Sequence, residues 1–223
     1  MAEPALVARC IAAMQSAVSL PVTVKCRIGI DDQEDYPALS GFVRAIAEAG
    51  ARTVIVHARK AWLNGLSPKE NRTIPPLKYD LVYRLKAEMP GMTVAINGGI
   101  ETLDQCQVHL AETDGVMLGR AAYQNPYMLA QVDRLLFADQ AIPPDRHAAA
   151  YRMAEYADQM VLDHGIRVGS VARHLVGLFQ GMPGARAFRR HLSENAHRPG
   201  ASGDVIRQAA DLVPSPLALT LAS

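Results

Sequence analysis

The sequence predicts an α/β fold, the C-terminal half of a (β/α)8 TIM barrel with four βα units, followed by a small all-α domain. Four short β-type segments alternate with amphipathic helical segments, as in parallel βαβ units. Two of the β-type segments run directly into glycines at their carboxyl ends. No β-type segment follows Pro126, and residues beyond it carry helical spacing. We therefore expect a half barrel over residues 1–142, a helical domain over residues 143–213 and a tail at residues 214–223.

Composition indicates an ordinary globular chain. The 223 residues are 49% hydrophobic and 20% charged, with a formal net charge of +1, so polyanion binding requires local patches. Cys10, Cys26 and Cys106 are far apart, without CxxC spacing, which fits a reducing compartment and argues against a metal site. We expect all three to be small core residues. The first residues show no basic region ahead of an apolar run, and no apolar stretch approaches the length of a membrane span, so we predict a cytoplasmic protein with no membrane partner.

The first half of the chain alternates helices and strands. A helix begins near Pro4, and its apolar residues Leu6, Cys10, Met14 and Val18 fall on one face. Residues 22–28 alternate as a strand with two different faces, with Lys25 in mid-strand. A second helix ends at Gly50, and the buried strand of residues 53–57 ends at His57. A further helix with Leu81, Val82, Leu85 and Met89 stops before Pro90.

A long connection over residues 59–78 has no helical or strand period. Connections of this length in a compact domain are usually functional or disordered. It contains five basic residues and the single acid Glu70; the basic residues are Arg59, Lys60, Lys69, Arg72 and Lys78. The connection therefore carries a local net charge of +4, and it is one of the local patches that polyanion binding would require.

Residues 94–126 form a βαβ unit with glycines at both strand ends. The strand of residues 94–96 leads into Asn97, Gly98 and Gly99, and that of residues 116–118 leads into Gly119 and Arg120. Thr102 and Gln105 predict a capping box on the intervening helix. Either glycine cluster alone is more often a tight turn, and the arginine a surface charge. Two clusters on successive parallel strands instead favour a phosphate site, the task of the last two loops in (β/α)8 barrels.

The number of strands has a consequence for the whole chain. A closed barrel of this type needs eight strands, and only four are predicted. If the phosphate loops follow the last two strands, these are the fifth to eighth. We therefore expect the chain to be the C-terminal part of a longer protein or the product of a late start codon. This polypeptide alone is expected to aggregate, to form a dimer through its open edges, or to fold only in its helical domain.

The helical region is rich in arginine. Between Gly165 and Gly200 only one acid, Glu194, accompanies six arginines: Arg167, Arg173, Arg186, Arg189, Arg190 and Arg198. Arginine without lysine favours recognition of phosphates or stacked bases. A solvated helix face explains the composition about equally well.

Five motifs resemble the tRNA-dihydrouridine synthases, most closely their A subfamily: VKCRIGID, HARKAWLNGLSPKENR, INGGI, DGVMLGRAAYQNP and GLFQGMPGARAFRRHLSENAH. The resemblance covers about residues 6–213. It implies an FMN-dependent enzyme in which NADPH reduces the flavin, and the flavin reduces a D-loop uridine of tRNA. It also implies a proton-donating cysteine in the N-terminal half barrel. None of the three cysteines matches that residue, so we assign no catalytic residue in this chain.

The resemblance assigns roles to individual residues. Lys25 and His57 match positions that contact the flavin, and the phosphate positions are Asn97, Gly98, Gly99, Gly119 and Arg120. Lys69 and Arg72 in the long loop, with Arg186 and Arg189 in the helical domain, match tRNA-contacting positions. The complete protein is expected to be monomeric. The alternatives are a non-catalytic tRNA-binding remnant, and another FMN barrel such as a dihydroorotate dehydrogenase, which leaves the arginine-rich domain unexplained.

Overall fold

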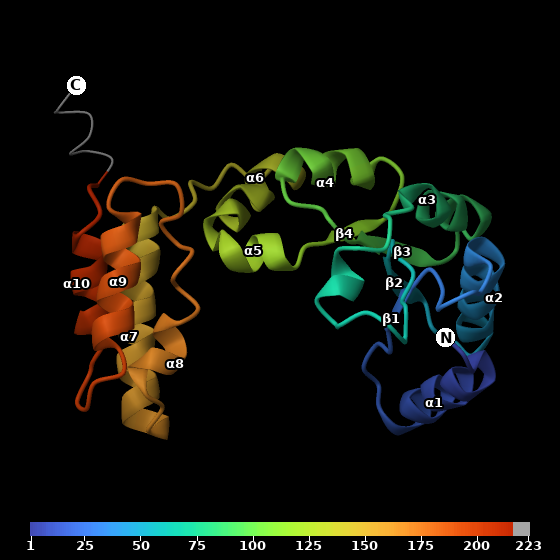
Figure 1. Ribbon diagram of the computed structural model, residues 1–223, viewed down its shortest axis with the longest axis horizontal. Coiled ribbons are helices and arrows are strands. Elements are labelled where there is room, and N and C mark those ends of the chain that lie inside the picture. Colours follow the sequence, from blue (N-terminus) through green and yellow to red (C-terminus); the bar gives the residue numbers. More distant parts are fainter. Residues whose placement is uncertain (216–223) are drawn as a thin grey trace. The chain divides into compact units, whose positions relative to one another are not determined.

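The computed structural model describes residues 1–215 and divides into two compact units, Met1–Gly119 and Arg120–Ser223 (Figure 1). The division falls earlier than the domain boundary expected at residue 142. Residues 120–136 belong to the second unit because they pack on its helices, as the contacts of Tyr127 below illustrate. Residues 216–223 of the expected tail lie outside the described part of the chain.

The first unit is built on a parallel sheet of four strands in the order β1-β2-β3-β4. The strands are β1 (Val24–Arg27), β2 (Thr53–His57), β3 (Thr93–Asn97) and β4 (Gly115–Met117). All four predicted strands are confirmed, with β1 shorter than the expected residues 22–28. Each strand lies beside the strand that follows it in sequence, and each pair is joined by a right-handed crossover connection. Because all the crossovers have the same hand, the connecting helices lie on one face of the sheet.

The connecting helices are α2 (Asp35–Glu48), α3 (Tyr79–Glu88) and α4 (Leu103–Leu110). The strand residues that face them, Val54, Val56, Val94 and Ile96, are fully buried. On the other face, Lys25 is exposed and Ile55 and Ala95 are half-buried. The sheet therefore has one covered face and one partly open face that carries the predicted site.

Local signals in the first unit are confirmed. Thr102 and Gln105 form the predicted capping box of α4, with Gln105 N donating to Thr102 Oγ1 at 3.2 Å. The long connection is not wholly irregular, because it contains the short 3-10 helix η1 (Glu70–Arg72).

The first helix, α1 (Pro4–Ala17), departs from expectation. Its Cys10 is exposed and was wrongly expected in the core; Leu6 and Met14 are also exposed, and Ile11 is the buried residue. The reason is that α1 packs against α2, where Gln15 Nε2 donates to Gly50 O at 2.9 Å. The buried side is thus not the predicted apolar face.

Within its described residues, the second unit contains helices joined by turns and loops, and no strand. It begins with α5 (Arg120–Gln124), the 3-10 helix η2 (Pro126–Gln131) and α6 (Val132–Leu136), in the region where the sequence carries helical spacing. The larger helices are α7 (Arg146–His164), α8 (Val168–Ala172), α9 (Ala185–Asn195) and α10 (Asp204–Asp211). Gly165 ends α7 in the left-handed conformation, with φ +63°.

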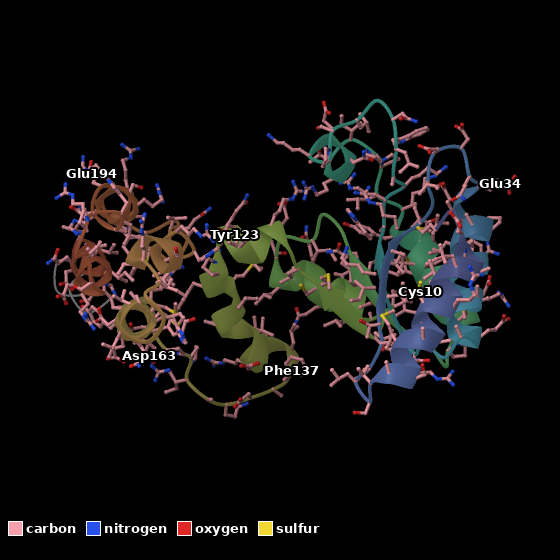
Figure 2. The ribbon with its side chains drawn as sticks, turned by 90° about the horizontal axis from the view of Figure 1, so that it is seen from below. Cys10, Glu34, Tyr123, Phe137, Asp163 and Glu194 are labelled. Atoms are coloured by element: carbon pink, nitrogen blue, oxygen red, sulfur yellow. The ribbon has the colours of Figure 1, made fainter. Side chains whose placement is uncertain are left out.

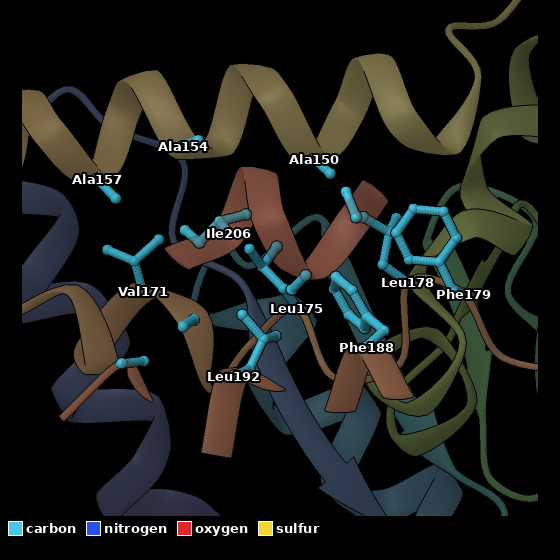
Figure 3. Packing of buried hydrophobic residues seen from close by; sticks show 14 of the residues in the cluster. Ala150, Ala154, Ala157, Val171, Leu175, Leu178, Phe179, Phe188, Leu192 and Ile206 are labelled. Atoms are coloured by element: carbon cyan, nitrogen blue, oxygen red, sulfur yellow. The ribbon is translucent and has the colours of Figure 1, made fainter. Parts of the chain in front are cut away.

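The core of this unit is organised along α7 (Figure 3). Ala150, Ala154 and Ala157 lie on one side of α7 and are fully buried, so neighbouring helices approach closely. Phe179 and Phe188 pack edge to face, with ring centroids 4.8 Å apart. Tyr127 joins this cluster, and the Arg146 guanidinium lies 4.2 Å from its ring centroid.

None of the helices within residues 1–215 combines the length and apolar character needed to cross a bilayer.

Candidate functional site

The carboxyl ends of the four strands form a register row. Arg27, His57, Asn97 and Met117 lie opposite one another across the sheet. Lys25 lies in the row two residues earlier, beside Ile55. Because side chains two residues apart on a strand share a face, Lys25, His57 and Asn97 all belong to the partly open face. The structure thus brings these three predicted cofactor residues together.

The turn after β3 is held by side chains. Asn97 Nδ2 donates to Met117 O at 2.7 Å, which ties the ends of β3 and β4. Gly98 has φ +118°, and a Cβ there would lie 2.5 Å from His57 Cδ2. Gly99 has φ +66°, and its Cβ would lie 2.6 Å from Leu77 Cδ1. Both glycines are therefore required by local packing, as in a tight turn.

The same turn offers hydrogen-bond donors. Within residues 1–215, the amides of Gly98 and Gly99 donate no hydrogen bond. At the end of β4, a Cβ on Gly119 would meet no heavy atom within 4 Å, so the backbone there is open to a ligand. Unsatisfied amides on a glycine turn are suited to an anion. The turn is consequently compatible with phosphate as well as with a packing role.

Lys25 supplies a cation on this face. Its side chain is exposed and forms no ion pair within the described residues. Cys26, the next residue, points to the opposite face and is buried, as the two-residue period predicts. Burial raises the pKa of Cys26 to about 12, so its thiol stays protonated and away from Lys25.

Arg27, to which the sequence motifs assign no role, also lies at the carboxyl edge of the sheet. Arg27 Nη1 donates to Lys60 O at 2.9 Å and to Asn71 O at 2.7 Å. Burial lowers the pKa of Arg27, and the charges of Arg59 and Arg72 lower it further. Arg27 therefore anchors the long connection onto β1. The sequence did contain a signal for this residue: Arg27 follows Lys25 by two positions on the same strand, so the two side chains share a face.

The positive charge of the long connection is partly neutralised. Asp35 on α2 pairs with Lys60 at 2.8 Å and also with Lys78. Desolvation raises the pKa of Asp35, but the hydrogen bonds and charges of the two lysines outweigh it, and the net direction is downward. Lys60 and Lys78 are thus structural cations. Lys69 and Arg72 remain exposed, with Arg72 Nε donating to Pro68 O at 2.9 Å.

The predicted phosphate residues fall in both units. Gly119 is the last residue of the first unit, and the exposed Arg120 begins α5 in the second. Arg186 and Arg189 lie on α9 and are exposed. Neither they nor Arg190 forms an ion pair within residues 1–215, whereas Arg207 of the same unit pairs with Asp158 and Asp204.

Among the described residues, no three His, Cys, Asp or Glu side chains lie close enough together to hold a metal ion.

The comparisons with known proteins assign the family. The family model "Dihydrouridine synthase (Dus)" matches residues 1–212. The chain therefore belongs to the dihydrouridine synthase family.

Relatives of known name agree with this assignment. A tRNA-dihydrouridine(20/20a) synthase of Vibrio cholerae is 51% identical over 215 residues, which are 96% of this chain and 65% of the relative. One of Shewanella oneidensis is 54% identical over 209 residues, 94% of this chain and 62% of the relative. The chain thus spans slightly less than two thirds of the length of these relatives.

Solved structures give only a weak similarity. A mandelate oxidase crystal structure covers 91% of this chain and is matched over 65% of its own length, at 15% sequence identity and a TM-score of 0.35. A similarity at this level carries no argument about fold or function.

Proposed function

We propose that this chain is the flavin- and tRNA-binding portion of a tRNA-dihydrouridine synthase, an oxidoreductase that uses FMN and NADPH to reduce D-loop uridine in tRNA. Family membership and relatives named tRNA-dihydrouridine(20/20a) synthase support it. In this proposal the four-stranded sheet is the C-terminal half of a (β/α)8 barrel, and the helical unit binds tRNA. The expected cytoplasmic location belongs to the same proposal.

The observation that carries the proposal is the row of side chains on the partly open face of the sheet. Lys25, His57 and Asn97 share this face, and the amides of Gly98 and Gly99 donate no hydrogen bond within the described residues. An unpaired ammonium group and free amides are the donors that an anionic cofactor needs. The residues present therefore fit FMN.

Each residue has a separate task in this proposal. Lys25 and His57 would contact the flavin ring, and the glycine amides with Asn97, Gly119 and Arg120 would hold its phosphate. Bound FMN supplies the hydride that reduces uracil. The lysine ammonium stabilises negative charge on its face of the sheet because it has no competing carboxylate within residues 1–215.

The chain's cysteines do not supply the proton. Cys26 and Cys106 are buried, and burial raises the pKa of each thiol. Cys10 is exposed, but it lies on α1 rather than at the carboxyl edge of the sheet. We assign the proton donor to no residue of this chain.

The proposed tRNA contacts lie on two exposed surfaces. Lys69 immediately precedes the 3-10 helix of the long connection and Arg72 is its last residue, while Arg186 and Arg189 share a face of α9. Cations at exposed positions are suited to phosphate contacts, which fix the register of the RNA without reading its sequence.

Titration of the purified chain with FMN, followed by flavin fluorescence, tests the cofactor assignment. Lys25→Met is expected to weaken FMN binding by roughly 10- to 150-fold, since a charge-assisted contact contributes about 1.5–3 kcal/mol. Arg52→Met is the matched control, because it removes an exposed cation immediately before β2, at the amino edge of the sheet. Equal affinities for both variants contradict the assignment. Absence of flavin binding with retained tRNA binding favours the non-catalytic alternative.

A further inference from the structure

A hollow in the second unit is not used by the flavin assignment. It has a volume of about 470 Å³ and lies between α5, residues 176–181 and α9. Its lining residues are Tyr123, Gln124, Val176, Gly177, Gln180, Gly181 and Arg189. This volume is within the range of small-molecule sites, and no described lining residue is acidic.

The floor of the hollow is packed tightly. A Cβ on Gly177 would lie 2.1 Å from Gln124 O and 3.1 Å from Pro126 Cδ. Only glycine lets the backbone of residues 176–181 lie this close to the end of α5. The position of α5 within the unit, and hence of Tyr123, is therefore fixed by main-chain contact.

Tyr123 is exposed but held in place. Its side chain is 56% exposed and projects from α5 (Figure 2). Its hydroxyl lies 3.1 Å from His174 Nδ1, and the two rings meet edge to face at 5.8 Å and 79°. Arg173 Nε lies 3.0 Å from His174 Nε2. A fixed aromatic ring loses little conformational freedom when a planar ligand stacks on it.

The polar groups of the hollow complement a nucleotide. Gln180 is exposed, and its amide has both donor and acceptor atoms. Arg189 has no ion-pair partner among the described residues, and it shares a helix face with Arg186 and Arg190. The chemistry is thus an aromatic surface and an amide beside a row of unpaired guanidinium groups.

We propose that this hollow binds one unpaired base of RNA, with the base stacked on Tyr123 and an adjacent phosphate on Arg189. The proposal rests on the proposed function, in which the helical unit binds tRNA, and adds a discrimination that phosphate contacts cannot provide. Bases in a duplex are already stacked, whereas unpaired bases can stack on an aromatic side chain. The site therefore selects single-stranded loops over paired stems.

Two RNA probes of equal phosphate number test this site in the full chain: a single-stranded oligonucleotide and a fully paired duplex. Tyr123→Ala is expected to weaken single-strand binding by roughly 5- to 150-fold, the range for loss of one base–aromatic stack, and duplex binding by less than about twofold. Tyr123→Phe keeps the ring and is expected to retain most of the single-strand affinity. Tyr156→Ala, which removes another exposed tyrosine of the same unit, is the matched control.

The outcomes separate this proposal from the proposed function. Wild-type chain that binds neither RNA nor tRNA contradicts the proposed function. Wild-type chain that binds RNA, with Tyr123→Ala weakening both probes equally or neither, overturns the base site alone. Photocrosslinking of 5-bromouridine RNA to the wild-type chain requires no substitution: a crosslink at Tyr123 supports the site, and crosslinks confined to residues outside the hollow overturn it.

Discussion

The hydroxyl of Tyr79 donates a 2.6 Å hydrogen bond to the carbonyl oxygen of Gly98. Tyr79 is the first residue of α3, and its ring also meets His109 of α4 edge to face at 4.5 Å. One side chain thus joins two helices to the turn after β3. Burial raises the pKa of Tyr79, so the donor proton is retained at physiological pH.

Tyr79→Phe is expected to lower the free energy of unfolding by about 0.5–1.5 kcal/mol, because it removes one partly buried hydrogen bond. It is also expected to weaken FMN binding, since the Gly98 turn loses a restraint. Urea denaturation and flavin titration measure the two effects. Tyr83→Phe removes the 2.7 Å contact with His109 Nδ1 instead, and is expected to affect stability only. Unchanged flavin affinity in Tyr79→Phe would separate the hydrogen bond from the site.

Gly98→Ala is expected to destabilise the first unit by more than about 2 kcal/mol, because strain at positive φ adds to displacement of His57. Gly65→Ala is the control: Gly65 also has positive φ, +84°, but no heavy atom lies within 4 Å of its Cβ position. The difference between the two variants in urea denaturation isolates the contact with His57. Equal losses would mean that His57 moves aside without cost.

Asp35 predicts a pH-dependent contribution to stability. Its pKa is depressed in the folded state, so its contribution is present above the ordinary value of 3.8 and is lost as pH falls through the lower folded value. Asp35→Asn is expected to lower the free energy of unfolding at neutral pH by about 1–3 kcal/mol, because the bonds to Lys60 and Lys78 are weakened. The free energy of unfolding of this variant is also expected to fall less steeply as the pH is lowered into the acid range. Unfolding measured from pH 2 to 7 tests this, with the exposed Asp32→Asn as control. If the free energy of unfolding decreases equally with falling pH in Asp35→Asn and in wild type, Asp35 does not contribute to the pH dependence of stability.

The cysteines are expected to differ in reactivity. Cys10 is exposed, whereas burial raises the pKa of Cys26 to about 12 and also raises that of Cys106. Because the thiolate is the reactive species, a disulfide reagent at pH 8 is expected to label one thiol in the native chain and the other two only in denaturant. Cys10→Ser should abolish the native reaction. Rapid native labelling of the Cys10→Ser variant would contradict the burial of β1 and α4.

The double variant Arg186→Ala, Arg189→Ala is expected to weaken tRNA binding and to flatten its salt dependence by roughly 0.7–0.9 units of log–log slope per lost phosphate contact. Flavin affinity should not change, because neither of these α9 residues is among those assigned to the flavin. Arg152→Ala removes an exposed cation of α7 and is the charge-matched control. Affinity measured over a salt series decides the matter; a slope equal to that of the control would indicate a solvated helix face.

The periodicity of apolar residues predicted the four strands of the sheet well. Buried parallel strands require runs of apolar residues, and such runs are visible in the local sequence. It failed where burial depends on a distant partner: the apolar spacing around Cys10 does not say which face of α1 meets α2. The same holds for Asp35, whose two lysines are far along the chain. The five-residue helix α5 is too short to show a period. The tight turn at Gly98 and Gly99 was predictable because strained turns restrict residue type locally, whereas their role in binding a cofactor stays a prediction.

The close approach of Gly177 to Gln124 bears on how the chain can be divided for experiments. A fragment that starts after residue 142, where composition changes, would leave that main-chain contact without its partner. It would also remove the ring of Tyr127 from the Arg146 guanidinium. A recombinant helical fragment should therefore start at Arg120, which keeps the first turns of the unit with the helices that bury them.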